Sequence, residues 1–281
     1  MDESRRAPEP FVVGRKSFTA VAVNTASKAG QWIKSKIGEY KQLQYKASIS
    51  DLVTEVDKGS EQMIRNLIST HFPDHAFLGE ESADGGITIE EAKEKEYVWI
   101  VDPIDGTTNF VHGFPFYCVS IALAHYGEVI VGVVYDPSND EMFVAEKGKG
   151  AYMHGRKMQV AADEQLRVSL IASGFPANAN AVRNLKVIET LLPRVRNIRT
   201  TGSAALHLAY VATGRISGFI EYGLSVWDMA AGILLVQESG GSVSDVHGQA
   251  YSLDVRDLVA TNGYIHEELV QQLQGDVDGS S

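Results

Sequence analysis

The stretch Trp99-Ile-Val-Asp-Pro-Ile-Asp-Gly-Thr-Thr-Asn109 joins an apolar run to two carboxylates, a glycine and two hydroxyls. The run predicts a buried strand, and functional groups often lie where a strand ends. Proline lacks an N–H and glycine permits a positive φ, so the chain can turn sharply and direct Asp102 and Asp105 to one place. Thr107 and Thr108 would then begin a helix or turn whose N–H groups suit a phosphate. A plain Asx turn with a helix cap is the alternative, and this stretch alone leaves both open.

Three further segments place acids where an element begins or ends. Leu78-Gly-Glu-Glu81 follows an apolar run, while Trp227-Asp228 and Asp51-Leu-Val-Thr-Glu-Val-Asp57 each open a helical pattern. Capping explains each acid taken singly. Together the segments offer oxygen donors alone, which suit Mg²⁺ or Mn²⁺ rather than a soft metal.

Apolar periodicity predicts mixed helix and sheet in the first half of the chain. Spacings of three and four residues predict helices over about 16–40 and 54–71. Short runs rich in β-branched and aromatic residues predict strands at 76–78, 97–101, 117–125, 129–135 and 142–145. Gly127-Glu128 has the composition of a two-residue type II′ hairpin turn. This half is therefore at least partly antiparallel.

Beyond Gly150 strands and helices alternate. Strands are expected at 170–172, 198, 218–221, 242–246 and 258–261, and helices at 181–192, 204–213, 226–238 and 264–273. We expect an α+β half over 11–150 with the main metal-binding motifs and an α/β half over 151–275 that closes the active site, together one compact unit. Residues 1–10 and 276–281 are expected to be disordered.

Composition excludes several classes of protein. The 281 residues are 44% hydrophobic and 22% charged, an ordinary globular composition. The net charge of −11 argues against direct nucleic-acid binding and against an anionic membrane surface, although acids clustered around cations can still attract a phosphate. Cys118 is the only cysteine, which excludes an internal disulfide and a cysteine-based zinc site. No run approaches ~18 apolar residues, so a cytoplasmic protein is predicted.

Taken in order along the chain, these motifs resemble the inositol monophosphatase family. The matching segments are 51–57, 79–82, 99–112 and 218–241, within a resemblance from about Ala20 to Thr261. The resemblance implies a layered αβαβα sandwich of the inositol monophosphatase and sugar phosphatase type. It also implies a Mg²⁺-dependent, lithium-sensitive phosphomonoesterase that forms a homodimer.

The resemblance implies two or three Mg²⁺ ions held by carboxylates from distant segments. One ion would bind to Glu80, Asp102 and the carbonyl oxygen of Ile104. Another would bind to Asp102, Asp105 and Asp228, so that Asp102 bridges the two. Mn²⁺ would substitute for Mg²⁺, whereas Li⁺ and Ca²⁺ would inhibit. Without cations these carboxylates would repel one another, so some should have a raised pKa.

The catalytic residues implied by the resemblance are Asp57, Glu80 and Thr107. Thr107 would orient a metal-activated water and would itself be hydrogen-bonded to Asp57. The substrate would bind to a wider set, which is Asp105, Gly106, Thr107, Thr108, Gly202, Ser203, Ala204, Glu221 and Asp228. Ser203 stands where several family members carry threonine, and it is also a candidate helix N-cap.

Inositol 1-phosphate is the first expected substrate, cleaved to the alcohol and phosphate. The same metal-binding residues serve relatives that act on fructose 1,6-bisphosphate, histidinol phosphate, 3′-phosphoadenosine nucleotides or NADP, so these substrates stay open. A regulator that binds transcription machinery is an alternative of a different class. Retention of every metal ligand together with Thr107 and Asp57 speaks against a pure scaffold. His112 and His207 are interpreted as packing or surface residues.

Overall fold

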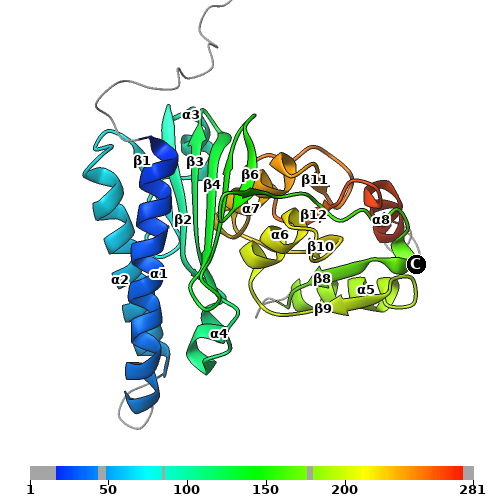
Figure 1. The fold of residues 1–281 in the computed structure, drawn as a ribbon, viewed down its shortest axis with the longest axis horizontal. Coiled ribbons are helices and arrows are strands. Elements are labelled where there is room, and N and C mark those ends of the chain that lie inside the picture. Colours follow the sequence, from blue (N-terminus) through cyan, green and yellow to red (C-terminus); the bar gives the residue numbers. More distant parts are fainter. Residues whose placement is uncertain (1–16, 44–48, 84–85, 176–179, 275–281) are drawn as a thin grey trace, which may run out of the picture.

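The computed structural model describes residues 17–43, 49–83, 86–175 and 180–274, which stack as alternating layers of helix and sheet (Figure 1). The terminal segments 1–10 and 276–281, which the sequence predicts to be disordered, lie outside the described residues. Within them the layers are, in order, α1 (Phe18–Leu43) with α2 (Ile49–Ser69), a first sheet, α6 (Ala204–Ala212) with α7 (Val226–Glu238), a second sheet, and α5 (Asn180–Leu191) with α8 (His266–Gln274). The predicted αβαβα sandwich is confirmed.

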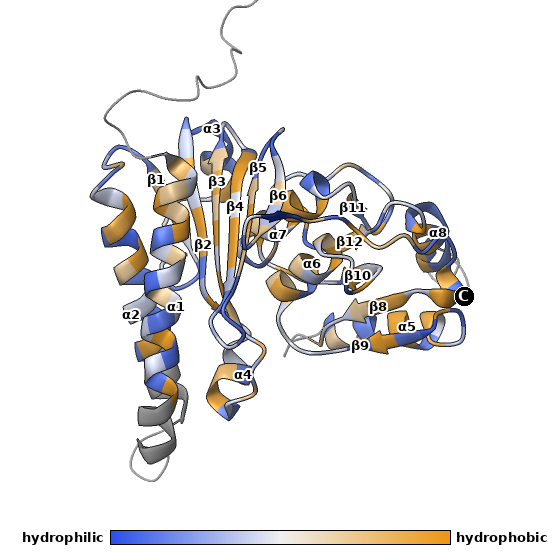
Figure 2. Ribbon diagram, viewed as in Figure 1, coloured by the Kyte–Doolittle hydropathy of each residue, from blue (hydrophilic) through white to orange (hydrophobic). Residues whose placement is uncertain are grey.

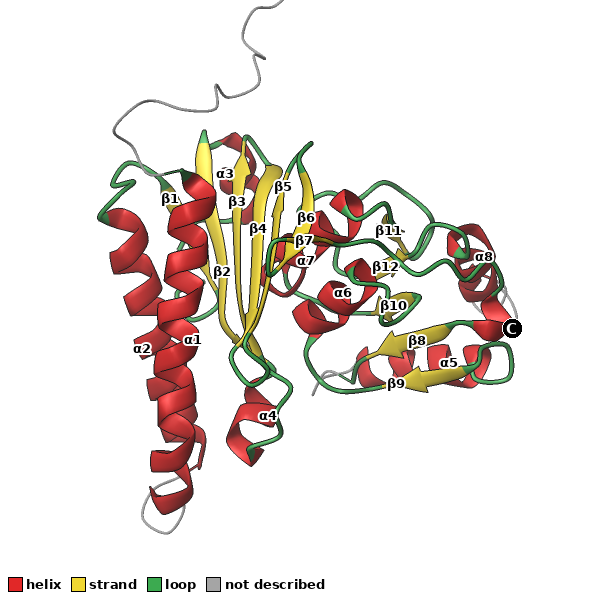
Figure 3. Ribbon diagram, viewed as in Figure 1, coloured by secondary structure: helices red, strands yellow, loops and turns green. Residues whose placement is uncertain are grey.

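The first sheet has its described strands in sequence order (Figure 3). They are β1 (Ala76–Gly79), β2 (Tyr97–Asp105), β3 (Cys118–His125), β4 (Glu128–Asp136), β5 (Glu141–Glu146), β6 (Gly150–Met153) and β7 (Arg156–Lys157). β1 is parallel to β2, and the other neighbours are antiparallel. Because β6 and β7 continue this sheet, the boundary that we placed near residue 150 falls inside it.

The second sheet has the order β11-β12-β10-β8-β9. Its strands are β8 (Leu170–Ser173), β9 (Asn197–Arg199), β10 (Gly218–Glu221), β11 (Ser242–Asp245) and β12 (Leu258–Thr261). β8 is parallel to β9 and β10, whereas β12 is antiparallel to β10 and β11. A short 3-10 turn, η2 (Leu166–Val168), leads into β8.

The side chains of β2 alternate between two hydrophobic layers. Val98 and Ile100 belong to the hydrophobic cluster that includes residues of α6 and α7, whereas Trp99 and Val101 belong to the cluster that includes residues of α1 and α2. Successive strand residues point to opposite faces, so a sheet covered on both faces needs a continuous apolar run. Figure 2 shows the central strands as hydrophobic between the two layers of helices. This packing buries β2 on both faces up to Asp105.

The β3–β4 hairpin differs from the prediction. Its two-residue turn is Tyr126-Gly127, with φ of 46° and 78°, and His125 pairs with Glu128. Positive φ at both positions is the type I′ conformation, which matches the twist of the flanking strands. The turn is therefore one residue earlier than predicted and type I′ rather than II′.

Two short helices were not among the elements that periodicity predicted. α3 (Ile89–Glu94) begins with a capping box between Thr88 and Glu91, and α4 (Thr107–His112) follows β2 directly. Each has six residues, too few to show a repeating apolar face. Among the described helices, none combines the length and the apolar character that crossing a membrane requires.

Candidate active site

The carboxyl end of β2 carries an irregularity that brings two aspartates into the site. Asp102 pairs with Ser120 and Asp105 pairs with Cys118, so β2 uses one residue more than β3 over this interval. Asp102 Oδ1 accepts the N–H of Ile104 at 3.0 Å, which stabilises the turn. An extra residue bends a strand and redirects its side chains. The bulge thus lets Asp102 and Asp105 both leave the sheet on the same side as the site.

Hydrogen bonds from Asn109 join α4 to the loop before α6, and we call this connection the strap. Gly106 begins α4 with φ of 92°, and a Cβ there would lie 2.9 Å from the carbonyl oxygen of Phe116. Asn109 Nδ2 donates to the carbonyl oxygens of Phe116 at 2.7 Å and Thr201 at 2.6 Å. Asn109 had no assigned role in the sequence analysis. Its amide holds together two segments that are both predicted to contact substrate.

Asp105 links the two halves of the chain. Its Oδ2 accepts the Ser203 hydroxyl at 2.6 Å and the N–H of Ala205 at 2.7 Å. Burial raises the pKa of Asp105, whereas these donors lower it. Ser203 also caps α6 by accepting the N–H of Leu206 at 3.3 Å, so the predicted N-cap is confirmed.

The four carboxylates predicted to bind metal lie close enough to raise one another's pKa. Burial raises the pKa of Asp102 well above its usual range, and the charges of Glu80, Asp105 and Asp228 raise it further. Burial likewise raises the pKa of Glu80 to about 7 and that of Asp228 to about 8, with Asp105 adding to both. A bound cation would relieve this repulsion. The donor set therefore fits a hard divalent cation.

The carboxylates are not already arranged as a metal centre. Across the described ranges, no three His, Cys, Asp or Glu side chains stand together in such an arrangement. Local donors hold their oxygens instead: the N–H of Ile104 binds Asp102, and the N–H of Ser225 binds Asp228 Oδ2 at 2.7 Å. Each of these hydrogen bonds occupies one carboxylate oxygen, so the second oxygen of Asp102 and of Asp228 can still bind a cation.

Thr107 has a different hydrogen-bond partner from the one expected. Its hydroxyl donates to the carbonyl oxygen of Ile104 at 2.9 Å rather than to Asp57, because a hydroxyl at the start of a helix readily reaches the carbonyl three residues earlier. Asp57 is buried on α2, and burial followed by the charges of Glu81 and Glu80 raises its pKa to about 8. Asp57 thus interacts with the acidic cluster from the α2 side.

Glu221 ends β10 and completes the cluster on the side of the second sheet. Burial, with the charges of Asp105 and Asp228, raises its pKa to about 8. Its carboxylate packs against Gly174, where a Cβ would lie 2.0 Å from Oε2. Three further residues are predicted to bind substrate. Thr108 is exposed on α4, Gly202 packs against Asn109, and Ala204 is the first residue of α6.

Two further buried residues lie at the site, and no motif in the sequence pointed to either. Cys118 Sγ lies 3.8 Å from Asp105 Oδ2 and 3.7 Å from Ser203 Oγ, and burial raises the pKa of its thiol. Glu61, on α2, accepts the backbone N–H of Glu81. The register of β3 against β2 would have revealed Cys118, but register is not readable from one sequence.

His207 is a buried packing residue, as interpreted from the sequence. Its ring lies between Phe116 and Phe219, with centroid distances of 5.5 and 5.1 Å. Burial lowers its pKa to about 3, so the imidazole is neutral. Its Nε2 lies 2.6 Å from Thr201 Oγ1, which further anchors the loop before α6.

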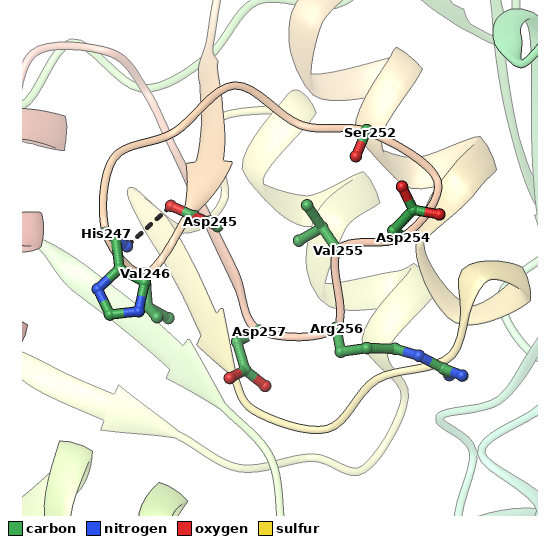
Figure 4. Close-up of a pocket in the computed structure, with 8 residues that line it drawn as sticks. All are labelled: Asp245, Val246, His247, Ser252, Asp254, Val255, Arg256 and Asp257. Carbon is green, nitrogen blue, oxygen red and sulfur yellow. Dashed lines mark hydrogen bonds between the residues drawn. The ribbon is translucent and has the colours of Figure 1, made fainter.

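A separate hollow of about 290 Å³ lies in the segment after β11 (Figure 4). Its acidic side chains have local partners: Lys93 binds Asp254, Arg183 binds Asp257, and Asp245 Oδ1 accepts backbone N–H groups. These contacts satisfy the charges without a ligand. The hollow neighbours the carboxylate cluster through Arg256, which lines it and whose charge lowers the pKa of Asp228.

Comparisons with known proteins show the family and the fold that this chain shares with them. The model described as "Inositol monophosphatase family" matches residues 15–277. The chain is 41% identical over 266 residues to inositol monophosphatase 1 of Solanum lycopersicum, covering 92% of this chain and 95% of that protein. It is 40% identical over 259 residues to the Nus factor SuhB of Pseudomonas aeruginosa, covering 90% and 94%. The solved inositol monophosphatase of Anabaena superposes with a TM-score of 0.80 at 35% identity, covering 92% and 95%.

Proposed function

This chain belongs to the inositol monophosphatase family, and on that premise we propose that it hydrolyses inositol 1-phosphate or a related polyol or sugar phosphate to the alcohol and phosphate. The observation that carries the proposal is the cluster of Glu80, Asp102, Asp105 and Asp228, whose charges raise one another's pKa. Such a cluster suits a phosphate-cleaving site only when divalent cations neutralise it.

Mg²⁺ is the proposed cofactor, as two or three ions. The residues that would hold it are the four carboxylates and the carbonyl oxygen of Ile104. When bound, Mg²⁺ would polarise the attacking water and offset the charge on the departing oxygen. Mn²⁺ would replace it, whereas Ca²⁺, with its looser coordination, and Li⁺ would inhibit.

Thr107 and Asp57 are proposed to prepare the attacking water. The Thr107 hydroxyl donates its hydrogen bond to the Ile104 carbonyl, so the lone pairs of the hydroxyl oxygen can accept a hydrogen bond from water. Asp57, whose pKa is about 8, is suited to hold a proton near neutral pH. Glu80 would act beside them as a ligand that faces the water.

Substrate recognition is proposed to divide between the two halves of the chain. The N–H groups of Gly106 and Thr107 would bind phosphoryl oxygens. Glu221 and Ser203 would bind the hydroxyls of the alcohol, and their neighbours Thr108, Gly202 and Ala204 would shape the same surface. Asp105 would order both sides, because it already connects β2 to α6.

The test is phosphate release from a panel of phosphomonoesters, with EDTA and with Mg²⁺. EDTA should abolish turnover and Mg²⁺ should restore it, and the panel should include the sugar, histidinol and nucleotide phosphates named above. Asp102→Asn should lose far more activity than Glu81→Gln, a matched change in a more exposed acid. Full activity without metal, or equal losses in the two variants, would contradict the proposed site.

A second candidate role is binding to another protein, which the similarity to a relative named as a Nus factor favours. Absence of turnover for every panel member would favour this role over hydrolysis. We also propose a homodimer. Light scattering during size-exclusion chromatography should then give twice the chain mass of 30.6 kDa.

A further inference from the structure

Glu61 is a buried carboxylate on α2 that neither the motifs nor the proposed mechanism use. Glu61 is only 4% exposed, and its Oε2 accepts a hydrogen bond from the backbone N–H of Glu81 at 2.8 Å. A buried carboxylate is costly unless polar or charged partners satisfy it. This hydrogen bond therefore ties α2 to the segment that carries Glu80.

Arg65, one helical turn later, contacts the same segment at its other end. Its Nη2 lies 3.6 Å from Glu61 Oε1 and donates to Ser82 Oγ at 2.7 Å. Its guanidinium carbon lies 4.0 Å from the ring centroid of Phe77, on β1. Glu61 and Arg65 together hold the chain before and after Glu80.

Gly79 allows the carboxylate of Glu61 to pack directly on the backbone. A Cβ at Gly79 would lie 2.3 Å from Glu61 Oε2 and 2.5 Å from its Cδ, closer than real Cβ contacts. On the opposite side, the N–H of Glu80 donates to the carbonyl oxygen of Val101, on β2, at 3.2 Å. The backbone around Glu80 is thus fixed between β2 and α2.

We infer that Glu61 is a positioning residue which, with Arg65, fixes the backbone from Gly79 to Ser82 and so keeps the Glu80 carboxylate beside Asp102. By doing so it sets the affinity of the cluster for a divalent cation. This inference rests on the proposed function and names a determinant of cation binding outside the ligand set. Glu61 acts through the backbone N–H of Glu81 rather than by contacting substrate.

The experiment is calorimetric titration of the metal-free protein with Mg²⁺, with folding checked by circular dichroism. Glu61→Ala should weaken Mg²⁺ binding by about 10- to 100-fold, the usual cost of losing a partner that orients a metal ligand. Glu61→Gln keeps an oxygen that can accept a hydrogen bond from the Glu81 N–H, so this variant should lose less than about tenfold in Mg²⁺ affinity. Equal losses in the two variants would overturn positioning, because charge alone would then explain the effect.

Two further variants complete the test. Asp74→Asn removes an exposed charge in the turn after α2 and should leave Mg²⁺ binding unchanged. Arg65→Met keeps the aliphatic stem over Phe77 but loses the Ser82 contact, so it should weaken binding, and its effect should not add to that of Glu61→Ala. If Glu61→Ala does not fold, unaltered binding in Arg65→Met would overturn the inference.

The outcome also separates this inference from the proposed function. Wild-type protein that binds Mg²⁺ and releases phosphate, together with a Glu61→Ala variant of unchanged affinity, would overturn only the role of Glu61. Wild-type protein that binds no Mg²⁺ would overturn both.

Discussion

Glu221 lies where β10 ends, buried against Gly174 and facing the charges of Asp105 and Asp228. We expect Glu221→Gln to raise the KM for a polyol phosphate by up to about tenfold, since a typical hydrogen bond contributes a net ~0.5–1.5 kcal/mol. The kcat for a simple aryl phosphate should hardly change, because that substrate has no hydroxyls for Glu221 to bind. Steady-state kinetics on both substrates measures this, and parallel losses would place Glu221 in the chemical step instead.

Thr107 is the second residue whose role can be isolated. Thr107→Ala should lower kcat by roughly 10²- to 10⁴-fold with little change in KM, because a positioned proton acceptor acts mainly in the transition state. Thr107→Ser keeps the hydroxyl and serves as the control. The proposed partnership with Asp57 predicts that Thr107→Ala combined with Asp57→Asn is scarcely worse than either change alone.

Additive losses of log kcat would refute that partnership. Purely structural roles for the two side chains would instead lower stability additively and leave the kcat of folded protein unchanged. Melting temperatures measured on the same three variants separate these readings.

Among the elements, the strap from α4 to the loop before α6 depends on Asn109. Asn109→Ala leaves the carbonyl oxygens of Phe116 and Thr201 without this donor, so it should lower the free energy of unfolding by about 1–3 kcal/mol. The KM for polyol phosphates should also rise, because the strap holds Gly202 and Ser203. Denaturant unfolding measures the first effect, with Gln62→Ala, on the exposed face of α2, as a control expected within ±0.5 kcal/mol. Unchanged stability in Asn109→Ala would contradict the strap.

Element boundaries were predictable where apolar periodicity is strong. α7 and the strands β10 and β12 have the predicted bounds, since polar or glycine-containing turns flank their apolar residues. The polar segment of α3 carries no such period, and its capping box became meaningful only once a helix was known to follow. The hairpin after β3 needed the φ values of two residues, which composition does not determine.

The residues of the carboxylate cluster were predictable because motifs carried them, but their contacts were not. The donor target of Thr107 depends on how α4 starts, and the role of Glu61 depends on how closely α2 approaches Gly79. Both are tertiary facts about backbone position. The assignment of cation ligands stays a prediction until Mg²⁺ binding is measured.

At the scale of the whole molecule, the buried acids make stability depend on pH. Asp57, Asp228 and Glu221 have pKa values of about 8 in the folded protein, against ~4 when unfolded. Between these values the unfolded chain is ionised while the folded protein retains the protons, so stability falls as pH rises. In EDTA, the Tm should drop between pH 5 and pH 8 by at least about 2–4 °C, the shift that ~1 kcal/mol produces.

Saturating Mg²⁺ supplies the comparison. A cation that neutralises the cluster should flatten or reverse this dependence, because the ionised carboxylates then have a favourable partner in the folded state. Differential scanning calorimetry in EDTA and in Mg²⁺ gives both curves. A Tm that rises with pH in EDTA would show that the acids are ionised and satisfied without a cation.

The order of the layers also determines how much of the chain must leave the ribosome before the first sheet can be covered on both faces. One face of the first sheet is covered by α6 and α7. In the chain α6 follows β8 and β9, and α7 follows β10. At about 5–20 residues per second, that face stays uncovered for seconds while its strands are already outside the exit tunnel. A nascent chain in this state exposes Val98, Ile100 and their neighbours to other chains. We therefore expect chaperone binding during synthesis to be greatest just before α7 emerges, when Asp228 has yet to join the other carboxylates.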